Sequence, residues 1–318
     1  MFFSRESAFS KSSQHQAPEC GINPGCDSYL QGFVGKGDKI LKRNVCKHHH
    51  IINRNIPKMN DSTKQIQAQF GAHADKYATS AVHAQGESLA RLVELTHPQP
   101  TWNMLDVSTG AGHTALKFAP LVAHVVAVDL TPQMLETARR LANERGITNI
   151  EFEPADAHAL PFEDNTFDLV TNRIALHHYT DARQAIVEMV RVCKPGGLIG
   201  FTDNIVPPDK VTAGHINHWE QLRDPSHHWE FPTARLKGMF ADAGVTVEHT
   251  EELEKEMEFD PWADRMGASD ELKTKLRQWM ANVPEPVAAW LKPRSEGEKL
   301  YFTLHEVVIV SRKKTAGS

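Results

Sequence analysis

The sequence is poor in cysteine and has no long apolar run. Only four cysteines occur among 318 residues, and three of them, Cys20, Cys26 and Cys46, precede position 50, which leaves Cys193 alone in the remainder. So few thiols exclude a disulfide framework and fit a reducing compartment. No apolar run approaches the ~18–20 residues of a membrane-spanning helix. We therefore expect a cytoplasmic protein without a membrane segment.

The main body also lacks an excess of basic residues. Residues 59–318 contain 36 Asp and Glu against 26 Lys and Arg, while residues 1–58 contain four against nine. Because non-specific nucleic-acid binding relies on a basic surface, we expect no nucleic-acid partner. A hydrophobic fraction of 40% and a charged fraction of 24% describe a globular protein with ample length for a core.

The first 58 residues differ from the rest of the chain. They are rich in Ser, Lys and Asn and lack apolar periodicity, which predicts a leader that is disordered or not native to the domain of residues 59–318. Its three cysteines, followed by histidines at positions 48–50, lack the C-x2-C pairing of zinc modules, so we expect no metal site. Organelle targeting by this leader stays open, although arginine is scarce for that role.

The stretch Trp102–Thr114 is the centre of the predicted fold. Trp102 to Val107 is apolar with an acid near its end, as in a buried strand, and Ser108 to Gly112 are mostly small residues that allow a tight turn. Helical apolar spacing begins at Thr114. A strand, a small-residue turn and a helix in this order open a nucleotide-type site at the carboxyl end of a parallel strand.

Two enzyme classes use such an opening. Gly110 to Ala115 fits the dinucleotide pattern G-x-G-x-x-G/A, with Asp129 placed to read a ribose. Asp106, just before the turn, favours a different ligand, because a carboxylate there would repel a pyrophosphate but attract an ammonium group. S-adenosylmethionine (SAM) carries an ammonium and a sulfonium but no phosphate. Asp106 therefore favours SAM over NAD.

Strands and helices alternate along the rest of the chain. Buried-strand patterns recur at residues 125–129, 150–153, 167–172, 198–203, 245–248 and 300–310, with helical patterns between most of them. This alternation predicts an α/β fold with a doubly wound, mostly parallel, Rossmann-like sheet of seven strands. Residues of about 207–231 and 259–298 are predicted to be helical cap insertions, after the fifth and sixth strands, above the ligand crevice.

In these features the chain resembles the class I SAM-dependent methyltransferases, and more narrowly the type-11 group that includes the UbiE-type enzymes. The resemblance covers roughly residues 70–313 and rests on five separate stretches. They are Leu105–Gly112, Val128–Thr131, Asp156-Ala157 with Leu160–Phe162, Thr166–Asp168 and Lys194–Gly197.

The resemblance implies how SAM would be bound. Asp106 would hold the methionine amine through the turn or a water, and Asp129 would accept both ribose hydroxyls. The remaining implied contacts are the turn residues Ser108, Thr109, Gly110, Ala111 and Gly112 at the methionine end, Leu130 and Met134 on the adenine face, Asp156 and Ala157 at the adenine edge, and a backbone carbonyl of Asn172 or Arg173 for the ammonium. Ser108 replaces the usual first glycine of the turn, so we expect it to avoid positive φ.

Other residues are candidates for the lid and for the chemistry. Tyr77, with Phe70, is predicted to cover the cofactor mouth. His177 and His178 follow the fourth strand, where a histidine could serve as a base or as an orienting donor. Asn172-Arg173-Ile174-Ala175 is not the Asn/Asp-Pro-Pro-Tyr/Phe signature of amide and exocyclic-amine methyltransferases, and a lone body cysteine disfavours arsenic methylation. The predicted acceptor lining is Arg223, His227, Trp229, Trp262 and Arg265, which would suit an anionic or oxygen-rich compound.

The sequence therefore predicts methyl transfer from SAM to oxygen, carbon or nitrogen of a small molecule, by in-line displacement. Three alternatives stay open. They are an NAD(P)-dependent oxidoreductase, a non-catalytic SAM-fold binding protein, and a transfer-RNA modifying enzyme, which the acidic body disfavours.

Overall fold

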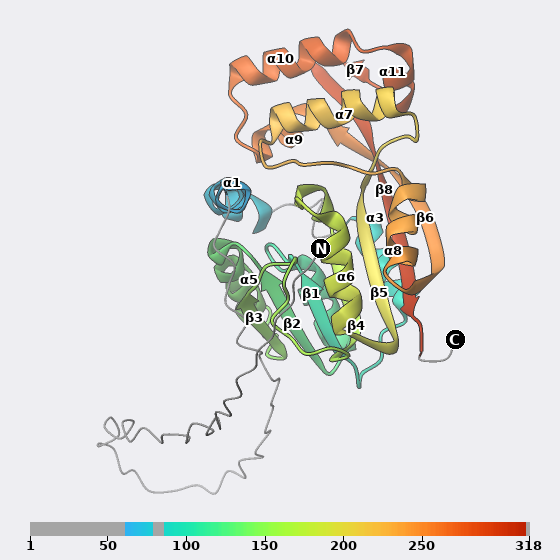
Figure 1. The fold of residues 1–318 in the computed structure, drawn as a ribbon. Coiled ribbons are helices and arrows are strands. Elements are labelled where there is room, and N and C mark those ends of the chain that lie inside the picture. Colours follow the sequence, from blue (N-terminus) through green and yellow to red (C-terminus); the bar gives the residue numbers. More distant parts are fainter. Residues whose placement is uncertain (1–60, 79–85, 316–318) are drawn as a thin grey trace, which may run out of the picture. The chain divides into compact units, whose positions relative to one another are not determined.

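The computed structural model describes residues 61–78 and 86–315, which belong to the compact unit His48–Ser318. A single mixed sheet runs through these residues in the order β3-β2-β1-β4-β5-β8-β6, and helices cover both of its faces (Figure 1). In the described part of the chain, no helix is long and apolar enough to cross a membrane. The predicted leader, with its cysteines and histidines, lies outside the described residues.

Five parallel strands confirm the predicted doubly wound core. Their bounds are β1 (Asn103–Val107), β2 (His124–Asp129), β3 (Ile150–Pro154), β4 (Phe167–Arg173) and β5 (Cys193–Ile205). β2 is buried at every position, as a strand covered on both faces must be. The strand order reverses between β1 and β4, and this is where a doubly wound sheet forms its ligand crevice.

The sheet has eight strands, so the predicted number of seven is wrong. Antiparallel β6 (Val245–Glu258) and β8 (Lys299–Lys313) extend it as expected, but a short additional strand, β7 (Arg294–Glu296), pairs with the start of β8. A two-residue turn joins β7 to β8, and Gly297 supplies the positive φ of 62° that this turn needs. All three β7 residues are exposed, so no apolar alternation marks the strand.

The helices beside the sheet form two layers. On one face lie α3 (Glu87–Thr96), α4 (His113–Phe118), the short helix η1 (Ala119–Leu121) and α5 (Pro132–Glu144), and their apolar side chains pack against β1, β2, β3 and β8. On the other face lie α6 (Ala182–Val192) and α8 (Thr233–Asp242), and they pack against β4 and β5. A short helix, η2 (Leu176–His178), follows β4 at the carboxyl edge of the sheet.

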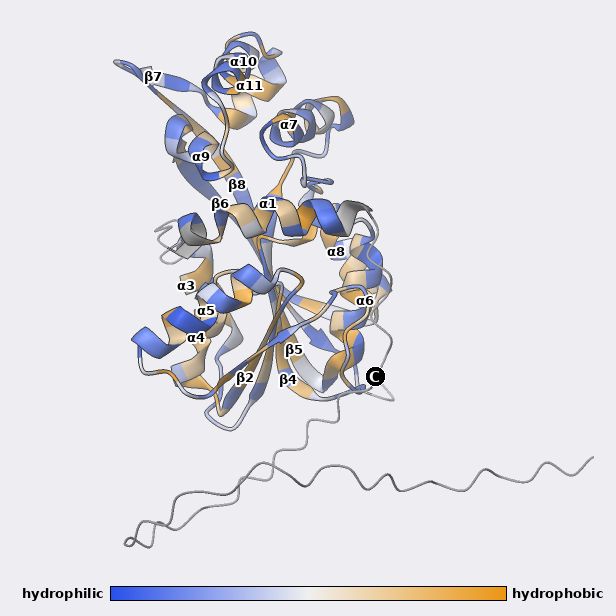
Figure 2. Ribbon diagram, turned by 90° about the vertical axis from the view of Figure 1, so that its left-hand side faces the viewer, coloured by the Kyte–Doolittle hydropathy of each residue, from blue (hydrophilic) through white to orange (hydrophobic). Residues whose placement is uncertain are grey.

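Four further helices of the described chain form a cap with an apolar cluster of its own. They are α7 (Lys210–Arg223), α9 (Phe259–Arg265), α10 (Asp270–Ala281) and α11 (Glu285–Leu291), and all four fall within the two ranges expected for the insertions. Trp219 of α7 stacks on Trp262 of α9 with ring centroids 4.3 Å apart, and Leu276 of α10 joins the same cluster. Figure 2 shows α1 (Asp61–Ala78) between this cap and the sheet.

Candidate functional site

A cavity of about 430 Å³ lies at the carboxyl ends of the parallel strands, between the sheet, α1 and the cap. Its volume falls in the range of small-molecule sites. Most residues that the sequence marks as candidates line it. They are Ser108, Thr109, Gly110, Ala111, Asp129, Leu130, Met134, Asp156, Ala157, Arg173, His177, His178, Arg223, Trp262 and Arg265.

Five candidates whose side chains the structure describes do not contribute to this wall. Asp106, Gly112, Asn172 and His227 are buried behind it, and Tyr77 belongs to α1 but its side chain lies outside the described residues. The Trp229 ring is 40% exposed and lines no part of the cavity. Only the backbone of Trp229 meets the site, because its N–H donates to the carbonyl of His177 and the ring is left at the surface.

Helix α1 is attached across the cavity by side chains that donate to backbone carbonyls. Gln67 Nε2 reaches the Leu130 carbonyl at 2.7 Å, on the side of β2, and Gln65 Nε2 reaches the Pro225 carbonyl at 2.8 Å, in the loop after α7. Gln69 and Lys76 donate in the same way to the loop and helix end around α9. One helix therefore bridges the two sides of the site.

The turn after β1 adopts left-handed backbone conformations at Ser108, Gly110 and Gly112, with φ of 54°, 53° and 83°. The expectation that Ser108 avoids positive φ is wrong. Its Oγ shares a 2.6 Å hydrogen bond with the hydroxyl of Tyr179, and this contact offsets part of the backbone strain. A Cβ on Gly110 would meet nothing within 4 Å, while one on Gly112 would lie 2.8 Å from the Ala138 Cβ. Gly110 thus leaves room for a ligand, and Gly112 allows α5 to pack closely.

Asp106 is buried behind this turn. It accepts hydrogen bonds from Thr109 Oγ1 at 2.6 Å and from Thr171 Oγ1 at 2.7 Å. Burial raises the pKa of Asp106 to about 6, although both hydroxyls and the nearby Arg173 oppose the shift. Since Asp106 does not line the cavity, it can act on a ligand only through the turn that it holds.

Asp129 ends β2 with its carboxylate at the cavity wall. Its two oxygens accept the backbone N–H groups of Gly110 and Thr131, each at 2.8 Å. The Thr131 side chain and the Leu130 backbone also hydrogen-bond to this carboxylate, which lines the cavity and can be reached by a ligand there. Burial raises the pKa of Asp129 and these backbone bonds oppose the rise. These bonds hold the carboxylate in a fixed orientation at the cavity wall.

Asp156 follows β3 and is paired with His158. His158 donates its backbone N–H at 2.9 Å and lies with its ring Nδ1 2.7 Å from the same carboxylate oxygen. Burial alone would raise the pKa of Asp156, but the bonds from His158 hold it below the ordinary value. Asp156 is thus ionised and fixed at neutral pH.

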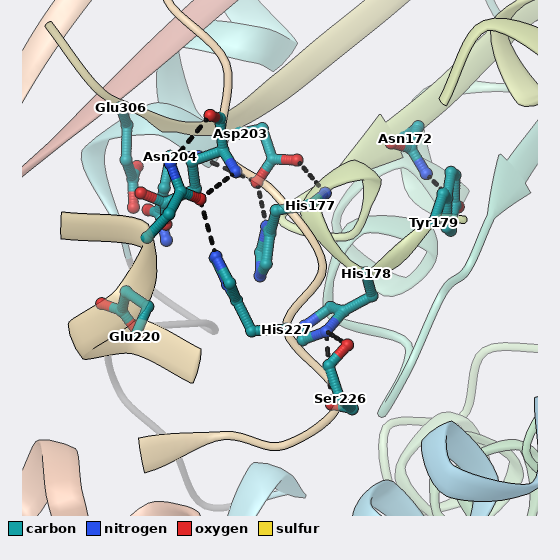
Figure 3. A network of polar contacts seen from close by, with 12 residues as sticks. Asn172, His177, His178, Tyr179, Asp203, Asn204, Glu220, Ser226, His227 and Glu306 are labelled. Carbon is teal, nitrogen blue, oxygen red and sulfur yellow. Dashed lines mark hydrogen bonds and ion pairs between the residues drawn. The ribbon is translucent and has the colours of Figure 1, made fainter. Parts of the chain in front are cut away.

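The paired histidines have opposite electrostatic environments (Figure 3). His177 Nδ1 lies 2.5 Å from Asp203 Oδ1, and the backbone N–H of His177 donates to Asp203 Oδ2 at 3.0 Å. Burial lowers the pKa of His177, but the Asp203 carboxylate more than compensates and raises it to about 9. His177 is therefore an imidazolium at neutral pH.

His178 lies against His177, with ring centroids 4.1 Å apart, and packs edge-on against Phe70 of α1. Its Nδ1 lies 3.1 Å from the carbonyl of Ser226, which can only accept, so Nδ1 carries the proton. Burial and the neighbouring His177 lower the pKa of His178 to about 4. Neither Nε2 atom of the pair has a hydrogen-bond partner among the described residues, and both rings line the cavity.

His227 supports this pair from behind. Its Nε2 lies 2.8 Å from Asn217 Oδ1, and its ring centroid is 5.6 Å from that of His177. Burial and the neighbouring cationic groups lower the pKa of His227, so the ring is neutral. Arg223, the adjacent cap candidate, lies with its guanidinium carbon 4.4 Å from the Trp262 ring and donates to Glu220 at 2.8 Å.

Sequence reasoning missed four residues of the site. Asp203 could have been found, because it ends a buried strand as Asp106 and Asp129 do. Tyr179 and His158 line the cavity, but their partners are distant in sequence or lie in loops. Lys255 of β6 also lines the cavity and carries no local signal. Among the residues that the structure describes, no group of three or more His, Cys, Asp or Glu side chains could hold a metal ion.

Comparison with known proteins agrees with this geometry. A family model described as "Methyltransferase domain" matches residues 105–201. The uncharacterized methyltransferase YcgJ of Bacillus subtilis is 35% identical over 247 residues, which span 77% of this chain and 98% of that protein. The ubiquinone/menaquinone biosynthesis C-methyltransferase UbiE of Pseudomonas putida is 39% identical over 125 residues, 38% of this chain and 49% of UbiE.

The fold is also similar to those of solved structures of related proteins. The YcgJ crystal structure aligns with a TM-score of 0.69 at 29% identity, covering 72% of this chain and 99% of that one. A putative methyltransferase from Bacillus halodurans aligns with the same TM-score at 33% identity, covering 71% and 99%. The chain therefore belongs to the methyltransferase domain family of type 11, and is a class I enzyme with SAM as its methyl donor.

Proposed function

We propose that this enzyme methylates a small-molecule acceptor from which His178 removes a proton as the methyl group transfers. The supporting observation is the pair of unlike histidines at the wall of the cavity. The imidazolium of His177 can donate from Nε2, while neutral His178 can accept at Nε2. Two such groups side by side suit an acceptor oxygen, nitrogen or carbon that must become more nucleophilic.

The donor end of the cavity follows from its acids. Asp129 would accept the ribose hydroxyls, with Leu130 and Met134 against the adenine face and Asp156 with Ala157 at its edge. The open space beside Gly110 would receive the methionine part of SAM. The ammonium of SAM would donate a hydrogen bond to the backbone carbonyl of Asn172 or Arg173. When bound, SAM supplies an electrophilic methyl group on a sulfonium.

The chain's own residues then prepare the acceptor. His178 takes the acceptor's proton at Nε2, and its Nδ1–H stays on the Ser226 carbonyl. With a pKa of about 4, the ring is unprotonated at every physiological pH, although its basicity is correspondingly low. His177, charged by Asp203, offsets that weakness because it stabilises negative charge on the acceptor atom. The new bond forms in line as the bond from carbon to sulfur breaks.

A methyl-transfer screen tests this proposal. Full-length protein is incubated with tritiated SAM and a panel of phenols, quinone precursors and small acids, and His178→Gln is compared with the surface control His218→Gln. We expect His178→Gln to lower kcat by about 10²–10⁴-fold, the usual contribution of a general base, with unchanged affinity for S-adenosylhomocysteine (SAH). Full turnover by His178→Gln between pH 6 and 9 would refute the base role.

A further inference from the structure

Three basic side chains lie near one another on the cavity wall, and Nε of one of them, Arg173, donates to Thr114 Oγ1 at 3.0 Å. Lys255 comes from β6, Arg265 from α9 and Arg173 from the end of β4, and all three line the cavity wall. Lys255 and Arg265 are ten residues apart in the chain, whereas Arg173 precedes Lys255 by 82 residues, so the fold brings Arg173 to the other two. The proposed proton transfer uses none of their charges.

One buried carboxylate lies behind the cavity wall and pairs with a member of this basic group. Glu306 of β8 is 3% exposed, and its Oε1 lies 2.5 Å from Lys255 Nζ. In the sheet, Lys255 faces Leu304 and Asn204 faces Glu306, so these side chains share one face of β5, β8 and β6. Figure 3 shows Glu306 beside Asn204, close to Asp203. Strand pairing thus fixes the backbone of Glu306, and its carboxylate pairs with Lys255.

The cations here outnumber the anions that act on Lys255. Burial lowers the pKa of Lys255, and the nearby Arg173 and Arg265 lower it further, while only Glu306 among its main charged neighbours opposes them. Asp106 and Glu306 both attract Arg173 from the buried side. Buried charge is costly unless it is paired. Each of these cations also has contacts within the protein, and an anion in the cavity would lie next to all three.

Charge is distributed unevenly along the cavity wall. Three of its acids, Asp129, Asp156 and Asp181, stand near β2, β3 and α6, at the end proposed for the methyl donor, while a fourth, Asp224, lies near His178 in the loop after α7. At the other end, the basic group surrounds the apolar side chains of Met257 and Leu304. The adenosine part of the donor fits the acidic end, through the contacts proposed above for Asp129 and Asp156. The basic end therefore fits the other substrate.

Building on the proposed function, we propose that Lys255, Arg265 and Arg173 form a subsite for an oxyanion of the methyl acceptor. The acceptor would be a small acid, with an apolar body over Met257 and Leu304 and its reacting atom near His178. Lys255 lies at the centre of this subsite, and Glu306 acts as its positioning residue. The same chemistry could in principle serve the carboxylate of SAM, so the test has to separate these two sources.

Calorimetry on SAH-saturated protein tests the subsite without requiring turnover. Benzoate is compared with benzamide, and 4-hydroxyphenylacetate with its amide, so each pair differs only in charge. We expect each acid to bind at least tenfold more tightly than its amide. Lys255→Met should abolish this preference, Lys255→Arg should keep most of it, and the surface control Lys275→Met should leave it unchanged. A wild-type protein with no preference for the acids would overturn the proposal.

Two further arms cover folding and the source of the anion. Because Lys255→Met leaves Glu306 buried without its partner, the double variant Lys255→Met/Glu306→Gln removes the pair together and should show the same loss of preference. SAH is also compared with 5′-methylthioadenosine, which lacks the amino-acid part. If Lys255→Met weakens SAH but not 5′-methylthioadenosine, the cations serve the donor and the proposal fails. Acid preference without any methyl transfer in the tritium screen would instead count against the proposed function.

Discussion

Replacing Asp129 by alanine should remove most of the affinity for the donor. The Asp129 carboxylate is held by the N–H groups of Gly110 and Thr131, and it lines the cavity. In the proposed complex, this carboxylate accepts the two ribose hydroxyls. Alanine at this position has no acceptor to replace them.

The magnitude follows from the number of bonds lost. A hydrogen bond to a charged group contributes about 1.5–3 kcal/mol, so two of them contribute about 3–6 kcal/mol. At about 1.4 kcal/mol per tenfold change, the Kd for SAH should rise by roughly 10²–10⁴-fold. 5′-Methylthioadenosine should weaken by the same factor, because it keeps the ribose.

Calorimetric titration with SAH measures this loss, with Glu136→Ala as the control for an exposed carboxylate on the neighbouring α5. The variant also frees two backbone N–H groups, each of which costs about 1–3 kcal/mol if it stays buried and unpaired. Urea unfolding must therefore show that Asp129→Ala is folded at the titration temperature. A folded variant whose Kd lies within threefold of wild type would refute the ribose assignment.

Further predictions concern pH and the turn. His177, with a folded pKa of about 9 against an ordinary 6.5, stabilises the fold fully below pH 6.5 and loses this effect as the pH rises towards 9. His178, with a folded pKa of about 4, makes the fold less stable as the pH falls from 6.5 to 4, because the ring takes up a proton in the unfolded chain before it does so in the folded protein. The urea midpoint should therefore peak near neutral pH, and Asp203→Asn should remove the alkaline loss; a monotonic profile would contradict both assignments. Tyr179→Phe should destabilise the protein by about 1–3 kcal/mol. In a Ser108→Gly background the same substitution should cost about 1 kcal/mol less, which a double-mutant cycle would measure. Full additivity of the two substitutions would show that the hydrogen bond between Ser108 and Tyr179 contributes nothing to stability.

The parts of the fold that the sequence predicted correctly are those with local signals. The apolar run before Val107, the small residues after it and the helical spacing from Thr114 lie within a dozen positions, and together they define the crevice. The acid at the end of β2 is recognised in the same way, because strand and acid are adjacent in the chain. The central parallel strands follow from the same apolar runs.

The features that the sequence missed depend on partners far away in the chain. Ser108 tolerates a positive φ because Tyr179, 71 residues later, bonds its hydroxyl. Lys255 reaches the cavity because β6 pairs with β8. Its partner Glu306 lies on β8, 51 residues later in the chain. β7 consists of three exposed residues and is a strand only because β8 is beside it. No local pattern encodes these contacts.

The attachment of α1 has a consequence for how this enzyme can diversify. Its glutamines and lysine donate to main-chain oxygens of Leu130, Asp264, Met266 and Pro225 and ignore the side chains at those positions. Substitutions in the loops around the pocket can therefore change what is recognised while the covering helix keeps every anchor. The main-chain oxygens of these residues anchor α1, while their side chains are free to set selectivity. Natural variation can therefore alter selectivity without disturbing the anchoring.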